Sequence, residues 1–141
     1  MRLLFIAFAA ALAAVIACSK NAPDESRIES FRGELYVDKG LDSVGGETTD
    51  TIEFILDDPY YTLFFITRNA RMCDSEGKVT DFGKPSVKLS PTHIFSGGCD
   101  SIRIPHGIFD AVFYGDTAAV LTRTDYERSI KYEMRLSKHG R

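Results

Sequence analysis

The strongest indication of fold is the segment SIKYEMRLS at residues 129–137. Its apolar residues alternate with polar ones, so every second side chain would lie on the same face of a β-strand. Such a strand has one face for a core and one face for water. The segment therefore predicts a half-buried strand near the end of the chain.

Two further apolar runs precede this strand, at residues 108–114 and 117–124. Gly115-Asp116 lies between them and is typical of a two-residue hairpin connection, because glycine readily adopts positive φ. Asp125-Tyr126-Glu127 joins the second run to the last strand. The C-terminal third of the chain therefore predicts three successive antiparallel strands, a meander.

The first half of the chain likewise contains short strand-like segments separated by turn residues. Residues 31–37 and 51–56 alternate between apolar and polar side chains, and Asp57-Asp58-Pro59 predicts a turn after them. Residues 60–67 are apolar on both faces, which predicts a central strand covered on both sides. Asp74-Ser75-Glu76-Gly77 predicts another turn before a strand at 78–82, and shorter strands are expected at 87–89, 93–95 and 101–104.

These segments together define the expected fold class. Turn signals recur roughly every 8–12 residues, and no convincing helical spacing of apolar residues follows residue 18. We therefore expect an all-β fold, a single small antiparallel β-barrel or β-sandwich of about eight strands. Pairing between neighbours in sequence favours the up-and-down barrel.

The N-terminus carries a different pattern. Arg2 is followed by fifteen residues, Leu3 to Ala17, that include no charge, glycine or proline. As a helix they would reach roughly 22 Å, short of the roughly 30 Å hydrocarbon core of a bilayer. A buried helix of a soluble core would not be apolar on every face. The run therefore predicts a secretory signal peptide.

This run ends in Val15-Ile16-Ala17-Cys18, which resembles the lipobox of bacterial lipoproteins. The resemblance implies that residues 1–17 are cleaved and that Cys18 is the lipidation site. Its thiol would carry diacylglycerol, and its freed amine would carry a fatty acid such as palmitate. The protein would then be attached to the membrane of the bacterial cell envelope. Ser19 resembles the residue that sorts such proteins to the outer membrane.

The chain beyond the anchor divides into two parts. Residues 18–30 are polar and contain one large apolar side chain, Ile28, so we expect a lipidated N-terminus and flexible tether. Residues 31–141 form the expected β-domain. Arg2 is the only charged residue among the first 17, so the remainder carries 16 of the 17 basic residues against all 20 acidic ones. No basic cluster is present, and we expect no nucleic-acid partner.

Cys73 and Cys99 are the two cysteines left after lipidation. Export would place them in an oxidising compartment, where two thiols of one small domain usually pair. A disulfide would stabilise the fold by roughly 3–4 kcal/mol. A metal pair or a redox pair is the alternative, but the Cys-x-x-Cys spacing typical of such sites is missing. We therefore expect a structural disulfide and no metal.

No catalytic motif is found in the sequence, so we expect neither catalytic residues nor a cofactor. Three weaker patterns stay open. One segment would form either a turn beside the disulfide or a tight turn that presents a nucleophile, namely Gly97-Gly98-Cys99-Asp100-Ser101. His93 and His106 are candidates for a base or a ligand. Asp50, Asp57 and Asp58 are candidates for a cation site or solvated turn residues.

These observations favour a non-enzymatic envelope protein that binds a protein or another envelope component. A hydrolase is a weaker possibility. One alternative is a lipocalin-like barrel for a small apolar ligand, although the Gly-x-Trp motif of lipocalins is missing. A second resemblance, in size, anchor and β content, is to lipoprotein inhibitors of lysozyme, with Ser96-Gly97 matching the start of their Ser-Gly-x-x-Tyr loop. Aromatic residues could form core or line a ligand cavity: Tyr60, Tyr61, Phe64, Phe65, Phe109, Phe113 and Tyr114.

Overall fold

The structure, a computed structural model, describes residues 28–39, 47–66, 73–95, 98–99 and 103–140. Within these ranges the chain forms eight β-strands. They are β1 (Glu29–Asp38), β2 (Thr48–Asp57), β3 (Tyr60–Phe65), β4 (Ser75–Thr80), β5 (Ser86–Ile94), β6 (Gly107–Tyr114), β7 (Ala118–Asp125) and β8 (Ile130–Lys138).

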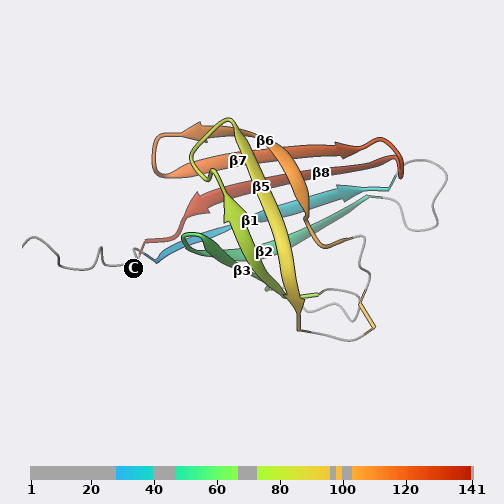
Figure 1. The fold of residues 1–141 in the computed structure, drawn as a ribbon, viewed down its shortest axis with the longest axis horizontal. Coiled ribbons are helices and arrows are strands. Elements are labelled where there is room, and N and C mark those ends of the chain that lie inside the picture. The colour runs from blue at the N-terminus through green and yellow to red at the C-terminus, as the bar shows by residue number, and fades with distance from the viewer. Residues whose placement is uncertain (1–27, 40–46, 67–72, 96–97, 100–102, 141) are drawn as a thin grey trace, which may run out of the picture.

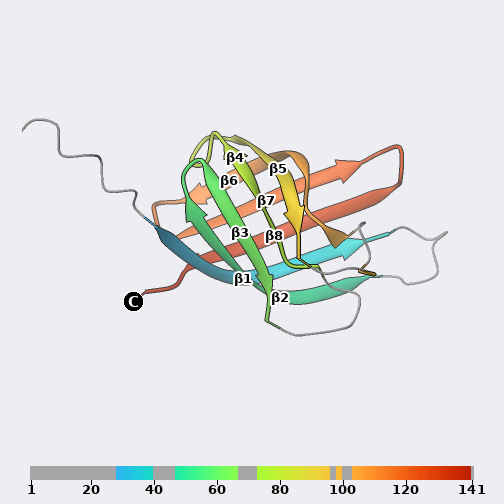
Figure 2. The same cartoon turned by 60° about the horizontal axis from the view of Figure 1, so that its bottom comes forward.

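The eight strands close into one antiparallel barrel in sequence order (Figure 1). Each strand pairs with its neighbours in the sequence, and β1 closes the barrel by pairing with β8 from Phe31↔Lys138 to Asp38↔Lys131. Figure 2 shows the same sheet wrapping around its interior from a second direction. The predicted all-β fold of about eight strands is confirmed, and of the two architectures expected the barrel is the correct one.

Several predicted elements differ from the observed ones. The turn predicted at residues 74–77 is wrong, because Ser75 to Gly77 begin β4, and Phe82 lies in the turn after that strand. The strands expected at 87–89 and 93–95 fall in one strand, β5, which ends at Ile94, one residue before the predicted end. Arg103 and Ile104, the described part of the strand expected at 101–104, precede β6 without forming a strand. β1 also begins two residues before the predicted start of the domain, at Glu29.

The prediction of a strand covered on both sides is also wrong. β3 is part of a single closed sheet, so its outward face meets solvent rather than a second layer. The outward residues Tyr60 and Phe64 are 55% and 38% exposed. Their inward neighbours Tyr61 and Leu63 are buried. A barrel wall therefore accommodates apolar residues on its outer face that periodicity alone assigns to a core.

The barrel interior is filled with side chains. Twenty buried residues form one hydrophobic cluster, to which all eight strands contribute. Tyr132, Phe54 and Phe109 are the largest side chains with less than 2% exposure. An eight-stranded barrel encloses a space just wide enough for its own side chains. Burial of this cluster is the main source of stability of the fold.

Two glycines allow the sheet to bend into a barrel. A Cβ atom at Gly33 would lie 1.8 Å from the carbonyl oxygen of Arg135, and one at Gly77 would lie 2.3 Å from that of Ser90. The strand register also shifts between Glu76 and Gly77. Bends and bulges at glycine are how antiparallel sheets curve toward closure.

The two ends of the barrel differ in how the strands are joined. At the turn end, residues 58–59, 81–85 and 115–117 connect the strands, and the start of β1 lies beside the end of β8 (Figure 1). At the loop end, the connections are residues 39–47, 66–74, 95–106 and 126–129. The shorter connections therefore gather mainly at the end from which the N-terminal segment departs.

Phe82 closes the turn end. Its ring lies 5.3 Å from that of Phe113, 5.7 Å from Phe31 and 6.0 Å from Phe54, measured between centroids. The turn that carries it is attached to β6, because the Ala111 amide donates a 2.8 Å hydrogen bond to the Pro85 carbonyl. The side chain of one turn thus packs over the opening of the barrel.

Candidate functional site

The predicted disulfide is confirmed. Cys73 and Cys99 are bonded to each other, with their Cα atoms 5.5 Å apart, and they connect two of the loop-end segments. Because the Cys99 sulfur is part of this bond, it is not a free nucleophile. Gly97, Asp100 and Ser101 lie outside the described residues.

The lipobox also lies outside the described residues, as do Cys18 itself and most of the predicted tether. Ser96-Gly97, the pair that matches the lysozyme-inhibitor loop, lies outside them as well. The lipidation of Cys18 and the function implied by that loop therefore stay predictions.

The two candidate histidines have different surroundings. His93 is exposed on β5, where its ring lies edge-on to Phe95 at 5.0 Å. His106 precedes β6, with Nδ1 2.9 Å from the Ile104 carbonyl oxygen and its ring 6.3 Å from Tyr132 in the barrel interior. One is thus on the outer surface, and the other is packed against the core.

The three aspartates considered for a cation are not gathered. Asp50 points into the loop end of the barrel, whereas Asp57 and Asp58 lie at the turn end, at the far end of the same strand. Within the described ranges, no three His, Cys, Asp or Glu side chains lie close enough together to hold a metal ion.

The aromatic residues divide between the interior and the outer wall. Tyr61, Phe65 and Phe109 are buried, and Tyr61 stacks on Phe54 with centroids 5.3 Å apart. Burial raises the pKa of Tyr61 to about 12, against a smaller opposing effect of the Ser75 hydroxyl. Tyr60, Phe64 and Tyr114 lie on the outer wall, and Phe113 is partly buried at the turn end. The interior aromatic residues therefore act as core.

The loop end of the interior contains buried charges. Arg103 Nη1 lies 3.7 Å from Asp50 Oδ2, and both side chains are more than 90% buried. Burial raises the pKa of Asp50, and the Arg103 guanidinium opposes this by lowering it. Arg123 pairs with Asp125 at 3.6 Å and lies over the ring of Tyr132 at 5.7 Å. Sequence periodicity did not identify these inward-facing charges.

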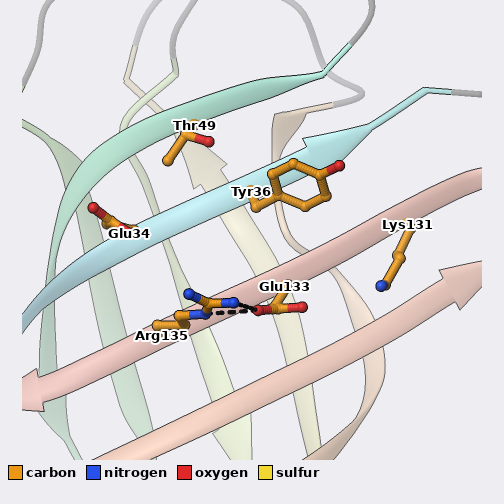
Figure 3. A pocket seen from close by; sticks show the side chains of 6 residues that line it. All are labelled: Glu34, Tyr36, Thr49, Lys131, Glu133 and Arg135. Carbon is orange, nitrogen blue, oxygen red and sulfur yellow. Dashed lines mark hydrogen bonds and ion pairs between the residues drawn. The ribbon is translucent and has the colours of Figure 1, made fainter.

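Two hollows of the described surface lie side by side on the outer wall. The first has a volume of about 290 Å³ and crosses β2, β1 and β8 (Figure 3). The second has a volume of about 390 Å³ and continues across β8, β7 and β6. Lys131 lines both. We call the two together the wall groove, lined by Glu34, Tyr36, Thr49, Ile108, Asp110, Thr122, Arg123, Thr124, Tyr126, Lys131, Glu133 and Arg135.

The barrel closure brings the groove residues together. Tyr36 on β1 pairs in register with Thr49 on β2 and with Glu133 on β8, so the three form one row across the outer wall. Arg135 Nε and Nη2 both donate to Glu133 Oε1, at 2.7 Å and 2.6 Å (Figure 3). A hydrogen bond between the Tyr36 hydroxyl and Glu47, together with burial and nearby acidic charges, raises the pKa of Tyr36 to about 12.

Sequence reasoning did not identify this groove. Most of its residues are the outward members of alternating strands, which the periodicity assigns to water, whereas Arg123 faces inward and Tyr126 follows the end of β7. One signal was available, since Tyr36 is an aromatic residue on a face otherwise formed by Arg32 and Glu34. The partner strands of Tyr36 could not be known before the barrel was closed.

The fold places the chain among small up-and-down antiparallel β-barrels. The chain matches no protein-family model, no curated protein and no solved structure. Within the part of the chain that the structure describes, no helix has the length and apolar character needed to cross a bilayer.

Proposed function

We propose that the protein is a lipid-anchored component of the bacterial cell envelope, attached in the outer membrane, whose barrel is a non-enzymatic binding module. Its partner is a protein or another envelope component. The observation that carries the binding role is the wall groove, an outward-facing hollow on a barrel whose interior is filled by its own side chains. The lipobox supports the location.

The anchor and the barrel together imply an orientation. Residues 19–28 separate Cys18 from the start of β1, and ten residues span at most about 35 Å when fully extended. Because β1 begins at the turn end, the tether leaves the barrel at that end. Tyr36 and Lys131 lie near the loop-end limits of their strands, so the wall groove lies toward the opposite end from the tether.

A second candidate function is supported by a hollow of about 240 Å³ at the turn end. Phe31, Phe82 and Phe113 line it, beside Glu29 and Asp116. A small apolar ligand could bind under Phe82 there, as in the lipocalin-like alternative. This volume is below the range of about 300–1,000 Å³ usual for small-molecule sites, whereas the second hollow of the wall groove, at about 390 Å³, lies within it.

The anchor is tested by Cys18→Ser in cells supplied with labelled palmitate. The wild-type protein should incorporate the label and sediment with membranes, because two or more acyl chains hold a protein there stably. The variant should lose both properties. A variant that is still labelled and membrane-bound would contradict the proposed anchor.

The binding role is tested by photo-crosslinking in intact cells. A photoreactive residue at Thr49, on the wall groove, should capture a defined partner that mass spectrometry identifies. The same residue at Tyr60, on the outer wall of β3, serves as the matched control and should not capture it. Equal capture from both positions would contradict the groove as the binding site.

A further inference from the structure

We propose that the second hollow binds an extended peptide segment of a partner protein, which adds as a strand between β6 and β7. This inference rests on the proposed function, since it names the chemical class of the partner. Three observations carry it: an open position in the hydrogen-bond ladder of the barrel, a buried arginine nitrogen beneath that position, and the hollow of about 390 Å³ that contains both.

β6 and β7 pair over only part of their lengths. Their register begins at the turn that joins them and stops at Asp110↔Thr122. Both strands continue further toward the loop end with their other neighbours, since β6 pairs with β5 as far as Gly107 and β7 pairs with β8 as far as Asp125. Beyond their last pair the two strands therefore diverge, as Figure 1 and Figure 2 both show.

The backbone groups of Ile108 and Thr124 face this opening. The Lys138 amide donates a 2.6 Å hydrogen bond to the Thr117 carbonyl, so the odd-numbered residues of β7 bond to β8 and the even-numbered ones, including Thr124, face β6. By the same alternation, Ala111 bonds toward β5 and Ile108 faces β7. Ile108 and Thr124 would form the next pair of the ladder, but the described strands do not pair there. Two N–H and two C=O groups are thus left open in the sheet.

Arg123 lies beneath the opening. Its side chain faces the barrel interior, where it lies over the Tyr132 ring and 3.6 Å from Asp125. Its Nε is 2.9 Å from the position that a Cβ atom at Gly107 would take, so the side chain reaches from β7 to β6. Its Nη1 is buried and has no hydrogen-bond partner among the described residues. A ligand that supplies an acceptor there would satisfy a donor that is costly to leave unpaired.

This arrangement of open groups matches an extended peptide. A strand that enters antiparallel to β7 is parallel to β6, because β6 and β7 run in opposite directions. One peptide residue would exchange two hydrogen bonds with Thr124, and its two neighbours would each form one with Ile108. Strand addition of this kind is a common way for proteins to bind extended peptides. The alternating backbone donors and acceptors are the property that selects a peptide.

The surroundings of the opening predict the sequence of the peptide. The residue opposite Thr124 would have its side chain on the outer wall beside Ile108, which is 62% exposed, and a β-branched side chain packs well beside such a neighbour. The residues before and after it would point inward, where Arg123 already occupies the space, so they should be small. Serine at these positions would also offer an acceptor to Nη1. We therefore expect the motif Ser-Ile-Ser.

The test is amide hydrogen exchange, measured by NMR on the full mature lipoprotein in detergent micelles. The probe is the pentapeptide Thr-Ser-Ile-Ser-Thr, acetylated and amidated at its ends and added to millimolar concentration. At saturation the exchange of the Thr124 and Ile108 amides should slow by about tenfold or more, because both become hydrogen-bonded. The Arg123 amide bonds to β8 and is the internal control, which should not change.

Two changes test the backbone pairing itself. Methylation of the isoleucine nitrogen in the peptide removes the donor to Thr124 and should weaken binding by about tenfold or more. Thr124→Pro removes the N–H of the protein and should weaken binding similarly, whereas Thr124→Ala keeps it and should stay within about threefold of wild type. If Thr124→Pro does not fold, the methylated peptide tests the same bond on the wild-type protein.

A third change tests the inward-facing positions. The peptide Thr-Phe-Ile-Phe-Thr keeps every backbone group but places large side chains against Arg123, so it should bind about tenfold more weakly or not at all. Hexalysine and hexaglutamate are the probes for a ligand recognised by charge, and neither should slow exchange at Thr124 and Ile108.

Five outcomes would overturn the inference. They are slow exchange at Thr124 and Ile108 before any peptide is added, no slowing at saturating peptide, unchanged affinity of the methylated peptide, equal affinity of the phenylalanine peptide, and slowing by hexalysine or hexaglutamate. Each leaves the proposed binding module testable, because photo-crosslinking from Thr49 in the first hollow reports a partner of any class. Absence of capture from Thr49 would instead contradict the binding module itself.

Discussion

The two ends of this barrel are stabilised by different kinds of interaction. At the turn end, the connections are two to five residues long, and the ring of Phe82 packs against other aromatic side chains. At the loop end, the longer connections are joined by the Cys73–Cys99 disulfide, and the interior holds the buried pair Asp50–Arg103. The turn end thus combines aromatic packing with the ion pair of Glu29 and Lys138, whereas the loop end combines a covalent bond with a buried ion pair.

This difference matters for function if the turn end faces the membrane. Packed apolar contacts do not respond to reduction, so the aromatic packing nearest the anchor should be unaffected by it. The loop end and the adjacent half of the wall groove would face the compartment where conditions vary. The comparison predicts that redox and pH changes act mainly at the loop end.

Loss of the disulfide should give the largest effect. Closing a loop with a sequence separation of 26 residues stabilises a fold by roughly 3–4 kcal/mol, because it lowers the entropy of the unfolded chain. The double variant Cys73→Ser with Cys99→Ser should lose that amount of free energy of unfolding, measured by urea denaturation. A reductant should destabilise the wild-type protein similarly and leave the variant unaffected. A loss below about 1 kcal/mol would show that other contacts hold the loop end.

Truncation of Phe82 tests the turn end. Substitution of a fully buried phenylalanine by alanine lowers the free energy of unfolding by about 3–5 kcal/mol. Phe82 is only partly buried, so Phe82→Ala should lower it by about 2 kcal/mol. Phe95→Ala is the matched control at the loop end, where the side chain is 50% exposed, and should cost less than about 0.5 kcal/mol.

Combining Phe82→Ala with the disulfide variant sharpens the comparison. If the two ends are independent, their losses in free energy of unfolding should add within about 0.5 kcal/mol. A larger deviation in the urea denaturation of the triple variant would mean that the ends are coupled through the packed interior.

The barrel was predictable from the sequence wherever one face of a strand meets water. Residues 129–137 alternate clearly, and Tyr132, Met134 and Leu136 are indeed buried. Residues 60–67 misled the prediction, because an apolar outer face such as that of Tyr60 and Phe64 resembles a covered strand when only periodicity is considered.

The missed features all depend on contacts between distant segments. Gly77 belongs to a strand because it lets β4 approach the Ser90 carbonyl closely, a reason that its neighbours in sequence do not reveal. Tyr36 acquires Glu133 as a neighbour only when β1 pairs with β8. Asp50, on the inward face of β2, acquires Arg103 as a partner from the connection before β6. Local sequence contains the strands but not these long-range pairs.

The smallest expected effect concerns Asp50 at low pH. Burial raises the pKa of its carboxyl in the folded state, so the unfolded chain ionises first as pH rises. The contribution of Asp50 to the free energy of unfolding is therefore fully present below its unfolded pKa of 3.8. It is lost as pH rises through the higher pKa of the folded state. Compared with Asp50→Asn, the wild-type protein should gain free energy of unfolding as pH falls from about 7 to about 4.

Arg103→Met gives this prediction a second arm. The guanidinium lowers the pKa of Asp50, so without it burial acts unopposed and the gain on acidification should be steeper than in the wild-type protein. Urea denaturation at several pH values measures both slopes. A wild-type protein that loses stability relative to Asp50→Asn on acidification would mean that the attraction of Arg103 outweighs burial. The loop end would then be held by a net favourable ion pair, as the turn end is held by its aromatic rings.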